Sequence, residues 1–196
     1  MSSPAERYAA FRRRADEQAA AGELGVFAAD LDFTLDPFQV EACRALERGG
    51  GVLVCAPTGA GKTVVGEFAV HLALRAGSGP RRKCFYTTPI KALSNQKYHD
   101  LVQRYGVASV GLLTGDNAIN AEAPIVVMTT EVLRNMLYAG SSTLDGLGYV
   151  VMDEVHYLAD RFRGAVWEEV IIHLPASVTL VSLSARCPTR RSSASG

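Results

Sequence analysis

Short apolar runs alternate with helix-patterned segments along most of this chain. Runs that are apolar throughout, rather than alternating with polar residues, are typical of strands buried on both faces of a sheet. The apolar runs cover 52–55, 83–87, 109–113, 125–129, 147–152 and 179–183, and the helical segments between and before them cover 39–47, 62–75, 91–105, 130–138 and 167–173. The pattern therefore predicts an α/β fold with three layers (αβα), in which helices cover both faces of a mostly parallel sheet.

The two ends of the chain differ from this alternating middle. Residues 5–21 are rich in Ala, Arg and Glu and are predicted to form one helix, so we assign 1–30 to an N-terminal helical extension. The main domain is predicted to cover 31–185. After that the apolar pattern stops, and 186–196 is an Arg- and Ser-rich tail that we expect to be disordered.

Composition limits the class of protein more than it identifies a partner. The chain of 196 residues has 20 Lys+Arg and 20 Asp+Glu, so any nucleic-acid site must be a local patch. The apolar runs are far too short to span a bilayer, and no apolar segment of a secretory signal follows the basic N-terminus. Four scattered cysteines favour reduced thiols over a zinc site. We expect a cytoplasmic protein with no membrane partner, and the oligomeric state stays open.

The octet 56–63 is the stretch with the most specific chemistry, because it follows an apolar run and begins a helical segment. Strand, glycine loop, Lys-Thr and helix is the order of a phosphate-binding loop, although position 56 is Ala where the general pattern has Gly. Lys62 adds a positive charge that serves binding and catalysis, and the Thr63 hydroxyl can bind Mg²⁺. The alternative is a chance Gly-rich turn before a helix. The predicted nucleotide contacts are Pro57, Thr58, Gly59, Ala60, Gly61, Lys62 and Thr63.

Two adjacent acids, Asp153 and Glu154, follow the apolar run 147–152. Ligands of open α/β sheets bind outside the carboxyl ends of the strands, where the phosphate-binding loop also lies. Hydrolysis of a nucleoside triphosphate needs a metal ion near the phosphates and a base that orients water, so we assign Asp153 to Mg²⁺, through water, and Glu154 to the base. Taken alone, the acids could instead cap a helix. Because the two loops must meet at one phosphate, the strands that end at Cys55 and Met152 are expected to be central.

In this order the motifs resemble the first RecA-like domain of superfamily 2 helicases of the DExH kind. Within them the chain is most similar to the Ski2-like group and its actinobacterial HelY-type RNA helicases, over roughly 5–185. The resemblance implies a RecA-like P-loop NTPase that uses ATP and Mg²⁺ and couples ATP hydrolysis to translocation along single-stranded nucleic acid, RNA rather than DNA. It also implies that Phe33 and Gln39 contact adenine, with Gln39 making two hydrogen bonds to its edge. His156 and Ser184 would couple the nucleotide site to the nucleic acid.

Without the resemblance, two of these residues have simpler interpretations. Gln39 is equally typical of a residue near a helix N-terminus, and His156 of a structural histidine with a hydrogen bond. Their roles therefore depend on the family pattern and not on the residues alone.

Three further segments that follow apolar runs resemble the nucleic-acid-binding motifs of the same family. They offer hydroxyls, helix-start N–H groups and cations, which contact phosphates without reading bases. None has an aromatic platform for stacking, so we expect contacts that tolerate any base sequence. Taken singly, each segment is more typical of an ordinary βα loop capped by Thr or Pro. The predicted strand contacts within 87–93, 111–116 and 128–134 are Pro89, Lys91, Thr114, Gly115, Thr129, Thr130 and Arg134.

The resemblance also implies a second RecA-like domain, which supplies an arginine finger and half of the strand-binding groove. We expect this chain to lack that domain. The alternative to a working helicase is therefore a non-catalytic fragment that binds nucleotide or nucleic acid.

The tail departs from the family pattern, because Ser184-Ala185-Arg186 stands where the family has Ser-Ala-Thr. The family continues much like Ala-Thr-Val-Ser-Asn-Ala-Glu-Glu-Phe-Gly-Glu-Trp. Deleting one adenine from a GC-rich coding of that sequence, with codons chosen to fit, yields residues 185–196 in full. We therefore interpret the tail as frameshifted. Resequencing the locus is expected to show an intact downstream frame one base away, and the absence of such a frame would remove the idea.

Overall fold

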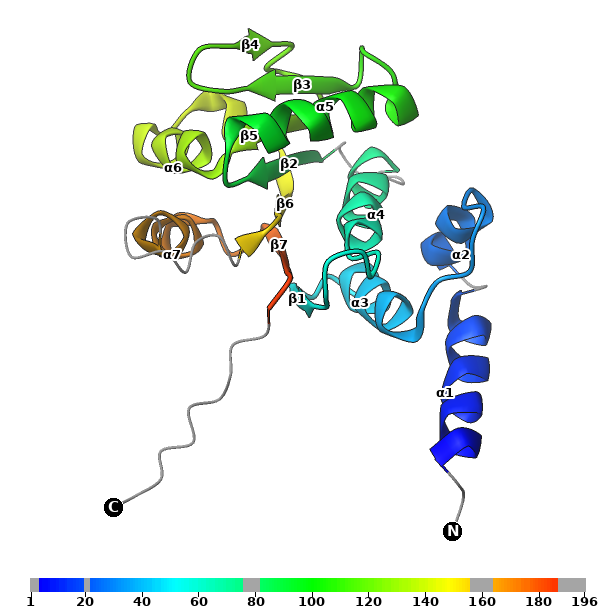
Figure 1. Cartoon of the computed structure of the whole chain (residues 1–196). Helices are drawn as coiled ribbons and strands as arrows, with labels where there is room; N and C mark the ends of the chain where they lie inside the picture. Colours follow the sequence, from blue (N-terminus) through cyan, green and yellow to red (C-terminus); the bar gives the residue numbers. More distant parts are fainter. Residues whose placement is uncertain (1–3, 20–21, 76–81, 156–163, 187–196) are drawn as a thin grey trace, which may run out of the picture.

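The computed structural model describes residues 4–19, 22–75, 82–155 and 164–186 (Figure 1). His156 and the segment 187–196 lie outside these ranges, so the predicted coupling role of the histidine and the predicted disorder of the tail stay untested. No helix within the described ranges has the length and apolar character needed to cross a membrane.

A seven-stranded sheet forms the centre of the described chain. Its strand order is β1-β7-β6-β2-β5-β3-β4, and all neighbouring strands are parallel except β3 and β4. The strands are β1 (Val52–Cys55), β2 (Lys83–Thr88), β3 (Val110–Leu113), β4 (Ala118–Ile119), β5 (Ile125–Thr129), β6 (Leu147–Met152) and β7 (Thr179–Ser184). The predicted α/β fold with a mostly parallel sheet is confirmed.

Helices pack on both faces of this sheet (Figure 1). The side chains of α2, α3, α4 and α5 share one apolar cluster with the sheet, and those of α6 and α7 share a second cluster on its other face. The helices are α1 (Pro4–Ala19), α2 (Gly22–Ala29), α3 (Pro37–Glu47), α4 (Thr63–Leu74), α5 (Lys91–Tyr105), α6 (Thr130–Ala139) and α7 (Gly164–His173), and a 3₁₀ turn covers Ser142–Leu144.

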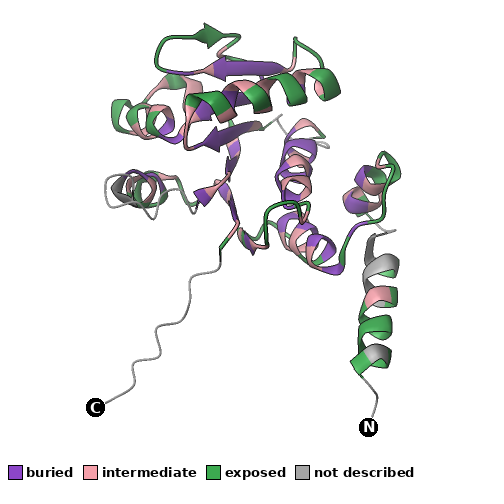
Figure 2. Ribbon diagram, viewed as in Figure 1, coloured by how far each residue is buried: buried purple, intermediate pink, exposed green. Residues whose placement is uncertain are grey.

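Successive strand residues point to opposite faces of a sheet, and both faces are buried in this one (Figure 2). In β2, Cys84 and Tyr86 belong to the cluster with α2–α5, whereas Phe85 between them belongs to the cluster with α6 and α7. Val150 and Val151 of β6 divide in the same way. This two-sided burial explains why the strands are apolar throughout, and it produces the three layers.

One expectation about the sheet is wrong. The strand that ends at Cys55 is not central: β1 is the edge strand of the described sheet, and β7 lies between it and β6. The loops after β1 and β6 can still meet, because parallel strands end at the same edge and one intervening strand separates them by only about 10 Å. A main-chain bond holds each end to a neighbouring strand: Ala56 N donates to Ser184 O of β7, and Asp153 N donates to Thr87 O of β2.

Neither the helix α2 nor the strand β4 was predicted. The chain forms a second helix, α2, which begins at Gly22 with a left-handed φ of 59°. Its Leu24 and Phe27 are buried, and Phe27 packs edge-on against Phe68 of α4. The apolar pair three residues apart after a glycine is the signal that could have identified α2. The short β4, by contrast, pairs antiparallel with β3 and is too short to leave a periodic pattern.

Candidate functional site

β1 leads directly into the phosphate-binding loop, and α4 begins at the end of that loop. Gly59 and Gly61 have φ values of 84° and 76°, a left-handed conformation that glycine adopts without strain. A Cβ atom on Gly61 would also lie 2.5 Å from Nε2 of Gln39. Both glycines are therefore needed for this backbone conformation. The loop places the first residue of α4, Thr63, at the carboxyl edge of the sheet.

Lys62 is folded back onto its own loop. Its Nζ atom donates to the carbonyl oxygens of Ala56 at 2.7 Å and Pro57 at 2.9 Å, and only 7% of the residue is exposed. A phosphate oxygen accepts the same hydrogen bond from the ammonium and adds a charge–charge attraction that a neutral carbonyl lacks. A phosphate oxygen can therefore replace the carbonyl oxygens of Ala56 and Pro57 as the acceptor of the Lys62 hydrogen bonds.

Gln39 connects α3 to the same loop. Its Oε1 accepts a hydrogen bond from the Asp36 amide at 2.7 Å, and its Nε2 donates to the Gly61 carbonyl at 2.9 Å. Both polar ends of the side chain thus contact protein, and adenine recognition by Gln39 stays a prediction that requires these bonds to be exchanged. Phe33, the other predicted adenine contact, lies in the segment before α3 and is half exposed.

Thr63, Asp153 and Glu154 come together in one pocket of about 260 Å³ at the carboxyl edge of the sheet. The other lining residues within the described ranges are Thr88, Leu93, Gln96, Lys97 and Asp100. Within the described ranges no three His, Cys, Asp or Glu side chains are grouped to hold a metal ion by themselves. One carboxylate and one hydroxyl beside a phosphate site nevertheless fit Mg²⁺, which keeps several waters and takes substrate phosphates as ligands.

The Asp153 carboxylate is held by two donors on different oxygens. Tyr86 Oη donates to Oδ2 at 2.7 Å, and the Glu154 amide donates to Oδ1 at 2.8 Å. Glu154 itself has a φ of 54°, an uncommon conformation for a residue with a side chain. Such strain persists where the surrounding structure over-determines it, often at functional sites. The pair is therefore arranged by contacts beyond its own turn.

Ser184 ends β7 beside the phosphate-binding loop. Its carbonyl accepts the Ala56 amide, while its hydroxyl donates to the Arg186 carbonyl at 2.6 Å. The predicted coupling residue therefore contacts the first residue of the phosphate-binding loop through its main chain.

The predicted strand contacts lie mainly in the loops after β2, β3 and β5, which are neighbours in the sheet. Thr130 Oγ1 donates to the Thr88 carbonyl at 3.3 Å, which brings the start of α6 against the loop that contains Pro89. Thr129, the last residue of β5, precedes it. Arg134 of α6 lies against a helix and not against these loops, because its guanidinium is 3.7 Å from the Glu169 carboxylate of α7.

Lys91 and the loop after β3 form one polar group. Lys91 Nζ donates to Asp116 Oδ1 at 2.6 Å, and Asp116 follows the predicted contacts Thr114 and Gly115. The hydrogen bond from Lys91 lowers the pKa of the Asp116 carboxyl below its ordinary value. Lys91 is therefore paired with a carboxylate at the position where the sequence predicts a phosphate.

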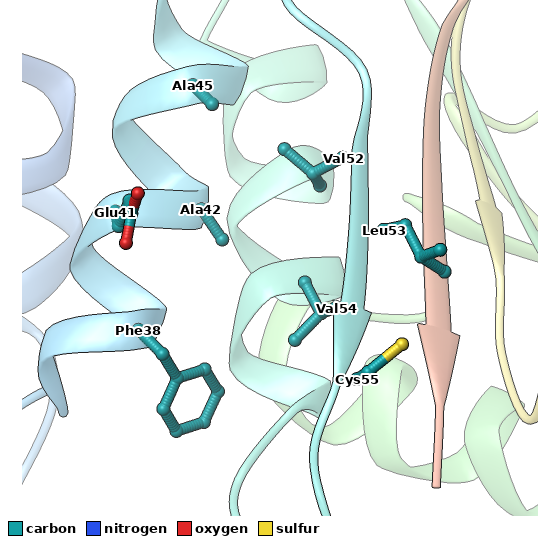
Figure 3. Close-up of a pocket in the computed structure, with 8 residues that line it drawn as sticks. All are labelled: Phe38, Glu41, Ala42, Ala45, Val52, Leu53, Val54 and Cys55. Atoms are coloured by element: carbon teal, nitrogen blue, oxygen red, sulfur yellow. The ribbon is translucent and has the colours of Figure 1, made fainter. Parts of the chain in front are cut away.

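A second groove, of about 430 Å³, lies between α3 and the outer edge of β1 (Figure 3). Its walls are Phe38, Glu41, Ala42 and Ala45 of α3 and residues 52–55 of β1. No residue of the phosphate-binding loop and neither acid lines it. It is therefore separate from the pocket of Thr63, Asp153 and Glu154.

Sequence reasoning missed the part of α5 that lines the pocket with the acids. Gln96, Lys97 and Asp100 reach it from the helix that the sequence assigned to nucleic acid. Tyr86 was also missed, because a tyrosine in an apolar strand gives no sign of its hydrogen-bond partner. Polar residues on one side of a helix that follows a motif strand were the available signal for α5.

Comparison with known proteins gives a consistent result. A family model described as DEAD/DEAH box helicase matches residues 36–193. "Probable helicase HelY" of Mycobacterium leprae is 71% identical over 163 residues, which is 83% of this chain and 17% of that protein. "ATP-dependent RNA helicase mtr4" of Schizosaccharomyces pombe is 52% identical over 156 residues, 80% of this chain and 13% of that protein. The solved structure of Mycobacterium smegmatis helicase Lhr bound to ssDNA and AMP-PNP matches with TM-score 0.62 and 27% identity, over 96% of this chain and 26% of that chain.

Proposed function

Because this chain belongs to the DEAD/DEAH box helicase family, we propose that residues 31–185 form the ATP-binding, RecA-like domain of an ATP-dependent helicase that acts on RNA. ATP use follows from the family. The observation that carries the assignment to particular residues is the shared pocket of Thr63, Asp153 and Glu154, directly beside the loop that contains Lys62. The chain covers less than a fifth of the length of the curated relatives reported above, so the activity of a whole protein is part of the proposal.

The proposed roles follow from the chemistry of each group. Lys62 exchanges its two loop carbonyls for phosphate oxygens, and Thr63 and Asp153 hold Mg²⁺, Asp153 through water. Bound Mg²⁺ supplies a positive charge that neutralises the phosphates. Glu154 orients the attacking water and accepts its proton. Gln39 and Phe33 contact adenine.

RNA is proposed over DNA because relatives at about half identity are named RNA helicases. The helicase in the solved structure is bound to ssDNA, so the preference needs its own test. We propose that the loops after β2, β3 and β5 hold phosphates of a single strand, and that His156 and Ser184 couple this contact to the nucleotide. A cytoplasmic location belongs to the same proposal.

An ATPase and binding assay on the 196-residue polypeptide, with and without single-stranded RNA, tests the proposal. We expect measurable binding of Mg²⁺–ATP and slow or no turnover. In related nucleotide hydrolases an arginine finger is worth ~10³–10⁵ in rate, and the family resemblance assigns that arginine to a second domain. Strong RNA-stimulated turnover that Lys62→Ala abolishes would show a working enzyme and contradict the expected fragment behaviour. Absence of any nucleotide binding would overturn the ATP-binding assignment.

Asp116→Asn is expected to strengthen binding of single-stranded RNA by roughly two- to fivefold, the affinity equivalent of one exposed ion pair. The carboxylate competes with phosphate for Lys91, and asparagine removes the competing charge but keeps the size of the side chain. A fluorescent RNA titrated across a salt series measures the change, and the gain should shrink at high salt.

Asp145→Asn is the matched control for Asp116→Asn. It makes the same change in net charge on an exposed residue just before β6, at the opposite edge of the sheet from the loops after β2, β3 and β5. Equal gains in the two variants would mean that only overall charge matters, and that Lys91 is not a strand contact.

The wild-type polypeptide should bind RNA and its DNA counterpart weakly, with a shallow salt dependence, because few phosphates are neutralised.

A further inference from the structure

We propose that Tyr86 is a positioning residue for Asp153: its hydroxyl fixes the carboxylate in the orientation that binds Mg²⁺. The inference rests on the proposed function, because it assumes that the pocket of Thr63, Asp153 and Glu154 holds Mg²⁺ with nucleotide. It adds a residue that lies outside the phosphate-binding loop and outside the acidic pair.

The sheet brings the tyrosine to the acid. Tyr86 lies in β2 opposite Val151 of β6, so its side chain points along the same face toward the end of the neighbouring strand. Its hydroxyl reaches Asp153 Oδ2 at 2.7 Å. This distance is typical of a strong bond from a hydroxyl to an ionised carboxylate.

The second donor completes the restraint. The Glu154 amide occupies Oδ1 of the same carboxylate, so one donor holds each oxygen and the group cannot rotate without losing a bond. Each carboxylate oxygen has a further lone pair, which is left for a metal ion or a metal-bound water. The carboxylate is thus oriented before any ligand binds, so binding of Mg²⁺ requires less free energy to fix its orientation.

The tyrosine ring cannot swing away from this position. A Cβ atom on Gly66 of α4 would come within 3.2 Å of Tyr86 Cε2, so the helix backbone packs closely on the ring. Lys97 Nζ of α5 lies 5.3 Å from the ring centroid. The two helices that approach the pocket therefore both contact the residue that holds Asp153.

Tyr86 is fully buried, so its hydroxyl reaches the Asp153 carboxylate without competition from bulk water. A buried tyrosine commonly finds a partner for its hydroxyl, so the test must separate positioning of the metal site from support of the fold.

Tyr86→Phe removes the donor and leaves the ring. We expect the concentration of Mg²⁺ that gives half-maximal binding of a fluorescent, non-hydrolysable ATP analogue to rise by about 10-fold, the usual effect of losing a partner of a metal ligand. Affinity for the same analogue in EDTA should stay unchanged, because among the described residues the Tyr86 hydroxyl bonds to Asp153 and not to the phosphate-binding loop. The ratio of the two affinities is the readout that a purely structural role would not move.

Tyr105→Phe is the matched control, because it deletes a buried hydroxyl on α5 that has no hydrogen-bond partner within the described part of the chain. It should leave both affinities at wild-type values. A wild-type Mg²⁺ titration for Tyr86→Phe, or an equal loss with Mg²⁺ and in EDTA, would overturn the positioning role while the proposed function stands. A wild-type protein with no Mg²⁺-dependent nucleotide binding would overturn the proposed function and this inference together.

Discussion

Lys62→Ala is expected to weaken ATP binding by roughly 30- to 150-fold, the equivalent of about 2–3 kcal/mol. The substitution removes the one full positive charge of the phosphate-binding loop. Its ammonium is already desolvated, since Lys62 is buried against the loop carbonyls of Ala56 and Pro57. A phosphate therefore replaces two neutral acceptors and does not have to strip water from an exposed lysine. Isothermal titration calorimetry with Mg²⁺–ATP measures the loss.

Two control variants define the meaning of that loss. Lys83 lies at the start of β2, at the amino edge of the sheet and opposite the phosphate-binding loop, and it pairs with Glu122 at 2.8 Å. Lys83→Ala should therefore leave ATP affinity unchanged. Lys62→Arg keeps the charge but not the compact ammonium, and it should recover only part of the affinity. Wild-type ATP affinity in Lys62→Ala, or an equal loss in Lys83→Ala, would show that the loop is not the phosphate site.

Phe68→Ala is expected to lower the free energy of unfolding by about 3–5 kcal/mol. The Phe68 ring is fully buried, so its removal leaves a cavity in the apolar core. Phe68 lies in α4, the helix that begins at the phosphate-binding loop. Its ring contacts Phe27 of α2 edge-on at 5.3 Å and stacks on His71 at 5.9 Å. Removing the Phe68 ring therefore also removes its contact with α2. The thermal midpoint of unfolding should fall by roughly 10 °C.

Chemical denaturation followed by circular dichroism measures this change in stability. Ile172→Ala is the control, because that side chain lies on α7 and 76% of it is exposed, so the expected change is within about 0.5 kcal/mol. A loss of less than about 1 kcal/mol for Phe68→Ala would contradict the packing of α2 on α4.

The sequence alone determined the order and type of most elements, because these depend on patterns within a few residues. The expected ranges 52–55, 91–105, 125–129 and 147–152 agree with β1, α5, β5 and β6. The glycine loop and the acidic pair were also evident, because a strand followed by such a motif places it at the carboxyl edge of the sheet whatever the order of the strands. What the sequence determined is therefore the α/β class and the edge at which the site lies.

Only the tertiary structure decided which residues meet at that edge. The insertion of β7 between β1 and β6 depends on strand order, which no local pattern encodes. The same is true of Tyr86 with Asp153, and of Lys91 with Asp116, whose partners lie 67 and 25 residues apart in the chain. A hydrogen bond or ion pair forms through distance in space, and the apolar strand around Tyr86 looks the same whether its hydroxyl meets a carboxylate or not. The packing of the sheet and helices is what selects the partner.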